Sequence, residues 1–183
     1  MNNLLPFNIQ IVSKELLEKI ANLAIQAVAI EWKAQGHNLT GKAIAELETK
    51  IVERGNDVVI QGYVLDYMAT INTGVTASRI PYSRGSGARS SQYIQGLTNY
   101  VKRRMGKSDK EAKSIAFAIA SKHKKEGMPT KSSRRFSKTG KRTGFIEQAL
   151  TDIEPELAQL IERSVEESIN FVIESYFKTQ LNR

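Results

Sequence analysis

The residues of this chain best suited to binding chemistry are the lysines and arginines of two neighbouring stretches. One stretch closes a predicted helix near residue 105. The other is the loop 128–144, which contains no acid and places Phe136 among its cations. Such a loop can follow a row of phosphates while the aromatic ring stacks on a base. The candidate contacts to a partner molecule or to DNA are Lys102, Arg103, Arg104, Lys107, Lys131, Arg134, Arg135, Lys138, Lys141 and Arg142.

Charge is divided unevenly along the chain. The net charge is +8, yet residues 79–142 alone contain 18 Lys and Arg against three acids, and the segments on both sides carry an excess of acids. This division is compatible with a footprint for nucleic acid, where released counterions supply affinity. It is equally compatible with assembly, in which the basic middle of one copy meets the acidic last helix of its neighbour. A third interpretation of the charge is a basic face that contacts only water. The loop 128–144 also has the composition of an extended arm that becomes ordered only against a partner protein.

Catalytic and metal-binding motifs are not recognisable. His37 and His123 are far apart in sequence and lack carboxylates at ligand spacing, so we expect both to be solvated. The glycines of 85–87 and 139–141 do not complete a phosphate-binding loop, and no nucleophile elbow occurs. The glutamates of the last helix are interpreted as a solvated face. The sequence therefore predicts a protein that is not an enzyme and that uses no metal or cofactor.

Composition excludes further classes of protein. The chain has 183 residues, 40% of them hydrophobic, which is too apolar for a wholly disordered chain and enough for one domain with its own core. It has no cysteine, so a disulfide scaffold and a zinc–thiolate site are impossible. No run approaches the roughly 18 apolar residues of a membrane span, and the first residues lack the pattern of a secretory signal. We expect a soluble protein of a reducing compartment.

The elements that must position these residues begin with a helix. Apolar residues recur at three- and four-residue steps behind Ser13, which predicts an amphipathic helix ending near Gly36. Alternation over 47–52, a turn near Gly55 and an apolar run then predict a β-hairpin, with a helix over 43–52 as the alternative. The segment 63–68 either continues the strand or begins a short helix.

The middle of the chain predicts two helices between two long connections. The connection 72–92 is followed by a helix that Ser91 can cap and that Gly106 ends. Ser108 and Glu111 match a capping box for the second helix, which Gly127 stops. The loop 128–144 comes next. Connections of this length inside a compact domain are usually functional or disordered.

A long last helix completes the predicted architecture. Thr151 or Asp152 is its expected N-cap, with Pro155 in the first turn and an apolar stripe reaching Phe177. We therefore expect an α+β fold in which a small antiparallel sheet, the hairpin, is packed by a long N-terminal helix, two central helices and a long C-terminal helix. The whole chain, 1–183, is expected to form a single domain with 72–92 and 128–144 as extended interaction loops.

Several short stretches together resemble a known family. They follow one another in a fixed order from the end of the first helix to the loop after the central helices. These stretches are LTGKAI at 39–44, INTGV at 71–75, YIQGL at 93–97, SIAFAIA at 114–120 and KEGMPT at 125–130. Their order resembles the small virion proteins of tailed bacteriophages that complete the tail or join it to the head, namely the neck, tail-completion and head–tail connector proteins. The resemblance covers roughly residues 13–175 and includes no catalytic motif.

This resemblance implies a structural function. A member of the family is a subunit of a ring, here a homo-oligomer of six or twelve copies, located in the virion at the head–tail junction after synthesis in the cytoplasm of the bacterial host. Its neighbours are portal or adaptor and tail proteins, it surrounds the DNA channel with non-specific contact to packaged DNA, and it meets no membrane. The segment 131–142 is longer and more charged than is typical, so it faces either protein or the DNA path. The alternative function is a basic nucleic-acid-binding protein, and a nuclease would need an acidic metal cluster that the basic centre lacks.

Overall fold

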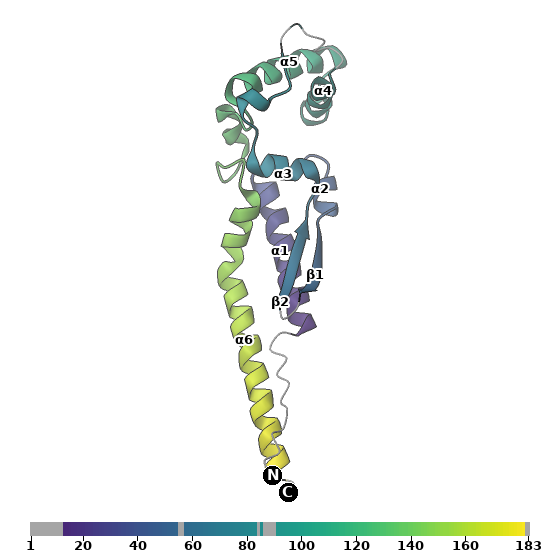
Figure 1. Cartoon of the computed structure of the whole chain (residues 1–183). Helices are drawn as coiled ribbons and strands as arrows, with labels where there is room; N and C mark the ends of the chain where they lie inside the picture. The colour runs from purple at the N-terminus through teal and green to yellow at the C-terminus, as the bar shows by residue number, and fades with distance from the viewer. Residues whose placement is uncertain (1–12, 55–56, 84, 86–90, 182–183) are drawn as a thin grey trace.

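The computed structural model describes residues 13–54, 57–83, 85 and 91–181, and the molecule is elongated (Figure 1). A long helix runs along most of its length, and a pair of shorter helices closes the end opposite to the tip of that helix. In chain order the elements are α1 (Lys14–Ala34), α2 (Lys42–Ala45), β1 (Glu48–Arg54), β2 (Asp57–Tyr63), α3 (Asp66–Thr73), η1 (Ala77–Arg79), α4 (Gln92–Met105), α5 (Asp109–Glu126), η3 (Lys131–Phe136) and α6 (Phe145–Leu181).

The part that we call the body consists of α1 to α3, the hairpin and α6. Helices α1 and α6 pack side by side in opposite directions (Figure 1). Ser13 begins α1 as predicted, because its hydroxyl accepts a hydrogen bond from the amide of Leu16 at 3.1 Å. Small residues alternate with large ones in the core that joins α1, α2, α3 and α6: Ala27, Val28, Trp32, Ala43, Met68, Phe145, Ala149 and Ile153.

The hairpin prediction is confirmed. Strands β1 and β2 pair antiparallel, with Glu48 opposite Tyr63 and Arg54 opposite Asp57, and they lie along α1. Helix formation in this region is restricted to the single turn of α2. The segment 63–68, for which the sequence allowed either a strand or a helix, contains the end of β2 and the beginning of the short helix α3.

The part that we call the head consists of η1, α4 and α5. Ile94 and Val101 of α4 are buried where it meets the small side chains of Ala112, Ala116 and Ala120 on α5, so the two helices can approach closely. The predicted capping box at the start of α5 is present, and Gly106 ends α4 in the left-handed conformation. Ser91 precedes α4, but its side chain makes no capping hydrogen bond.

The start of α6 corrects the prediction. We expected the helix to begin at Thr151 or Asp152, but it begins at Phe145, and Pro155 lies inside it rather than in its first turn. Phe145 and Ala149, one turn apart, are 0% and 1% exposed in the core against α1. Burial of this first turn outweighs the hydrogen bond that a proline inside a helix cannot donate.

Both predicted interaction loops are partly folded, and their described parts meet where the head joins the body. The segment 72–92 contains η1, and Val75 forms a backbone bridge with Met128; residues 84 and 86–90 lie outside the described part. The segment 128–144 contains η3, and the Lys138 amide donates to the carbonyl of Ala34 at 2.8 Å. A hydrogen bond within the chain thus fixes this loop against the body. The predicted fold class, α+β with one small antiparallel sheet, is confirmed.

Candidate partner-binding cleft

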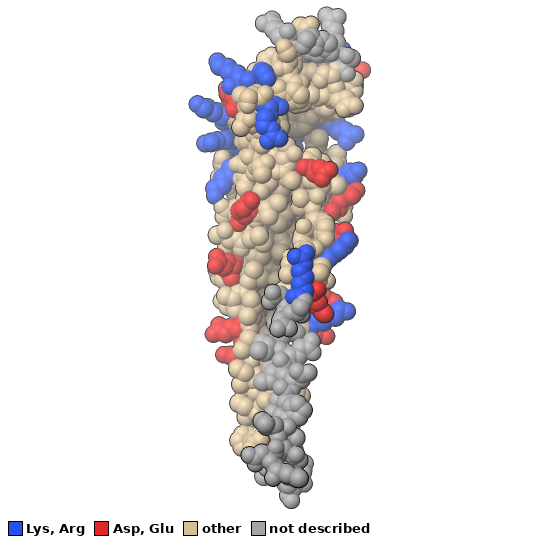
Figure 2. All heavy atoms as spheres, viewed as in Figure 1, with Lys and Arg blue, Asp and Glu red and all other residues tan. Residues whose placement is uncertain are grey.

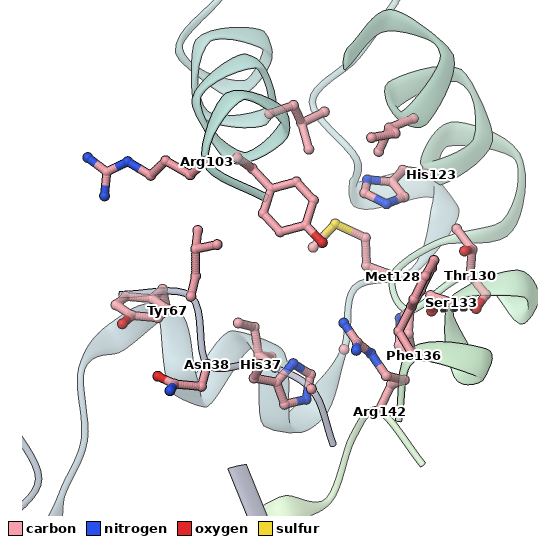
Figure 3. Close-up of a pocket in the computed structure, with 18 of the residues that line it drawn as sticks. His37, Asn38, Tyr67, Arg103, His123, Met128, Thr130, Ser133, Phe136 and Arg142 are labelled. Atoms are coloured by element: carbon pink, nitrogen blue, oxygen red, sulfur yellow. Dashed lines mark hydrogen bonds between the residues drawn. The ribbon is translucent and has the colours of Figure 1, made fainter. Parts of the chain in front are cut away.

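A cleft of about 690 Å³ lies between the head and the body (Figure 3). The head contributes residues of α4 and α5, the body contributes the end of α1, α2 and α3, and η3 forms a third wall. In Figure 3, His37, Phe136 and Arg142 lie together on one side, Tyr67 lies across from them, and Arg103 extends outward from α4. The chain therefore brings residues more than 100 positions apart to one hollow surface.

The floor of the cleft is aromatic. Trp32 is 2% exposed, its ring lies 4.7 Å from the ring of His37, and it meets Phe145 edge-to-face at 5.0 Å. A ring nitrogen of His37 lies 3.3 Å from Oε1 of Gln35, whose side chain is fully buried. Trp32 Nε1 has no hydrogen-bond partner among the described residues.

Arg142 is a half-buried cation at this floor. Its Nη1 donates to the backbone carbonyl of Gln35 at 2.8 Å, while its Nε is buried without a partner among the described residues. Burial, together with the positive charge of Arg104, lowers the pKa of Arg142, and Tyr100 opposes that effect. No described carboxylate lies within ion-pair distance of Arg142. A desolvated cation without a counter-charge favours an anionic partner.

Both histidines are partly buried, which corrects our expectation that they are solvated. Burial and the nearby charge of Arg142 lower the pKa of His37 to about 4, and burial lowers the pKa of His123, with Glu126 opposing it. The His123 Nδ1 lies 2.6 Å from the hydroxyl of Tyr93, whose pKa burial raises to about 12. Packing under neighbouring elements, which sequence spacing does not reveal, removes these rings from water.

The third wall is built by η3. The Ser133 hydroxyl donates to the Thr130 carbonyl at 2.7 Å, and the guanidinium of Arg135 lies 4.8 Å from the centre of the Phe136 ring. The wall is seated close to the end of α1, since a Cβ at Gly36 would lie 2.3 Å from the carbonyl oxygen of Phe136. Phe136 itself is 53% exposed. The predicted aromatic among the cations is therefore accessible to a ligand.

The ten predicted contact cations do not form one surface. Arg103, Arg135 and Arg142 line the cleft, and Arg104 Nη1 donates across it to the Asn38 carbonyl at 3.3 Å. Lys102 pairs with Asp109, and Lys107 lies 3.8 Å from Glu111.

The other cations of the set belong to the segment after α5. Lys131 and Arg134 are exposed on η3, and Lys138 and Lys141 are exposed on the loop before α6. The side chain of Lys141 meets Gln148, which lies in the first turn of α6. Figure 2 shows blue side chains gathered over the head end of the molecule and red ones below them along the flank. The candidate site is thus a cationic cleft surrounded by a wider basic surface.

Sequence reasoning missed the aromatic and apolar part of the cleft. Trp32, Tyr67 and Tyr100 come from three separate predicted elements. No spacing joins these residues, because they meet only when the head folds over the body. The one available signal was the density of cations near 131–142, which correctly marks one wall.

The residues that line the cleft offer cationic and apolar contacts. Four cations line it, Arg103, Lys122, Arg135 and Arg142, and none of the described residues that line it is Asp or Glu. No group of three or more metal-ligating side chains occurs in the described part of the chain.

Among the described helices, none is long and apolar enough to cross a membrane. Comparison of the chain with protein-family models, with curated proteins and with solved structures finds no match.

Proposed function

We propose that this chain is a structural subunit of a tailed-bacteriophage virion. In this proposal it forms an oligomeric ring at the head–tail junction, joins the capsid portal to the tail, and surrounds the channel through which DNA passes. Its neighbours are further copies of itself and portal, adaptor or tail proteins. The order of short motifs in the sequence suggests this location, and self-association is the part of the proposal that the geometry supports best.

The observation that carries the proposal is the exposed apolar surface on the far half of α6. The last buried residue of α6, among those described, is Ile153, although the helix continues to Leu181. Beyond it, Ile169, Ile173 and Phe177 are 50%, 48% and 59% exposed. They recur every four residues and so share one face of the helix. Contiguous apolar side chains of this kind mark an interface with another molecule.

The distribution of charge also supports association between copies. The far part of α6 carries Glu162, Glu166, Glu167 and Glu174 against Arg163 and Lys178, whereas the head and η3 are basic. Attraction between unlike parts of two copies suits a closed ring, in which each subunit uses two different faces. Contacts of this kind weaken as salt is added.

The test is the oligomeric state of the purified chain. Light scattering and electron microscopy at about 0.1 M salt are expected to give a discrete ring, and high salt is expected to shift the mass toward the monomer. A monomer under all conditions, including high protein concentration, would contradict the proposal.

A second candidate function is binding of nucleic acid by the basic surface. The observation in its favour is that Arg134 and Lys138 are exposed near Phe136, where they can meet a phosphate backbone beside an aromatic ring. Binding to duplex and to single-stranded DNA should be measured over a salt series. Submicromolar affinity with a steep negative salt slope supports this alternative, and absence of binding near physiological salt favours the structural function.

A further inference from the structure

We propose that the cleft of one copy receives the far part of α6, residues 162–177, from a second copy of the chain. This inference rests on the proposed self-association and adds the two surfaces that meet. The incoming helix would place Ile169, Ile173 and Phe177 against the apolar walls and Glu162 and Glu166 near the cations.

The cleft has the chemistry of a receptor for an acidic amphipathic helix. Its walls carry apolar side chains from both parts, including Leu97 and Ile119 of the head and Ile71 of the body. Its charges are cations only, as far as the described residues show, and the half-buried Arg142 has no carboxylate within ion-pair distance among those residues. A ligand that brings both apolar side chains and carboxylates therefore satisfies both parts of the surface.

The segment 162–177 has the complementary chemistry. Glu162, Glu166, Ile169, Ile173 and Phe177 are spaced by three or four residues, so they form one line along α6, with acids at its start and apolar side chains at its end. Side-by-side packing of two such lines in parallel would bring like charges together, which opposes association. A cationic and apolar cleft fits this line better than a second α6.

The helix that fills the cleft must come from another copy. Helix α6 begins three residues after Arg142, directly below the cleft, and runs away from the head (Figure 1). At 1.5 Å per residue, Ile169 lies about 36 Å along the helix from Phe145. A continuous helix cannot return over that length. Docking in the second copy joins two different faces, which is the geometry that closes rings.

Site-directed crosslinking tests the contact directly, because the chain has no cysteine of its own. Asn170→Cys flanks the apolar line on α6, and Ser132→Cys is exposed on the η3 wall of the cleft. The two purified variants are mixed, treated with a short bismaleimide and analysed as dimers on denaturing gels. We expect a crosslinked dimer in the mixture and little in either variant alone. Phe171→Cys is the control, because Phe171 is exposed and lies two residues from both Ile169 and Ile173, on the opposite side of the same helix. It should crosslink weakly with Ser132→Cys.

A charge exchange provides a second measurement that does not depend on the crosslinker. Glu162→Lys combined with Glu166→Lys, and separately Arg103→Glu combined with Arg135→Glu, should each weaken association by about tenfold or more. Mixing the two double variants should restore association, because the opposite charges again face each other. Circular dichroism of each variant checks that it is folded.

The outcomes separate this inference from the proposed function. Strong crosslinking of Asn170→Cys with itself, without crosslinking to Ser132→Cys, would show that two α6 helices meet each other and would overturn the inference. An intact oligomer with neither crosslink nor charge rescue would also overturn it while leaving the ring proposal standing. A chain that never associates would remove both.

Discussion

Asn72 joins the end of α3 to the start of α6, and its replacement should loosen the junction beneath the cleft. Asn72 is 8% exposed. Its Oδ1 accepts from the Ile146 amide at 3.0 Å, and its Nδ2 donates to both carboxylate oxygens of Glu147 at 2.8 and 2.9 Å. The Ile146 amide lies in the first turn of α6, where no intrahelical acceptor exists, so Asn72 caps a helix that begins 73 residues later.

The magnitude follows from these bonds. Loss of a capping acceptor costs about 1 kcal/mol, and loss of the bonds to Glu147 adds about 1 kcal/mol, since water can solvate that exposed carboxylate once the amide is gone. Asn72→Ala should therefore destabilise the chain by about 2 kcal/mol, a fall of about 4–8 °C in Tm for a chain of this size. Thermal unfolding followed by circular dichroism measures the change. The control is Thr73→Ala, because Thr73 is exposed and its hydroxyl bonds only to nearby carbonyls.

The aspartate variant gives a sharper test with a defined sign. Asn72→Asp retains the acceptor for Ile146 but places a second carboxylate beside that of Glu147, which raises the pKa of the pair. Its deficit in stability relative to the wild type should be largest at pH 7 and should shrink as the pH falls and one carboxyl is protonated. Adding Glu147→Gln should restore stability at pH 7. A deficit that is independent of pH, or an alanine variant within 0.5 kcal/mol of the wild type, would refute this account of the junction.

Two further predictions concern the floor and one wall of the cleft. Gly36→Ala and Gly41→Ala both place alanine at a φ near +76°, an unfavourable conformation that costs about 1 kcal/mol. Only Gly36 faces the carbonyl of Phe136, so Gly36→Ala should unfold at a clearly lower denaturant concentration than Gly41→Ala. Equal unfolding midpoints for the two variants would contradict the close approach of Gly36 to Phe136. The lowered pKa of His37 means that the folded state binds the proton less well than the unfolded state, so stability should fall as the pH drops from about 6.5 toward 4. His37→Gln should flatten that part of the pH profile in urea titrations, and an unchanged profile would show that His37 is not the titrating group.

Local rules predicted the elements whose formation depends on neighbouring residues. Ser13 begins α1, Ser108 and Glu111 form the capping box of α5, and Gly106 and Gly127 end the helices that precede them. The hairpin follows from alternation and a turn. In each case the interacting groups lie within a few positions of one another, so sequence spacing contains the information.

These local rules failed where packing between residues distant in sequence determines the structure. The sequence places the start of the last helix at Thr151 or Asp152, because nothing in it reveals that Phe145 packs against Trp32 and that α6 therefore begins at Phe145. The cleft was not predicted from the sequence for the same reason. The sequence names its cations as candidate contacts but does not show which of them face the cleft, whereas the fold turns some into the cleft and pairs Lys102 with Asp109. The ring, its copy number and its neighbours remain predictions.

Two features of the isolated chain are unfavourable for a chain that folds alone, and a single contact would relieve both. Ile169 and its neighbours on α6 expose apolar surface to water, and the half-buried Arg142 has no carboxylate within ion-pair distance among the described residues. Sequences that fold alone tend to remove such conflicts, and those that persist gather at functional sites. The first feature lies at one end of the molecule and the second lies in the cleft near the opposite end, so no motion within one copy can bring them together. A second copy can, and its acidic, apolar helix would bring a carboxylate to Arg142 and cover its own apolar line.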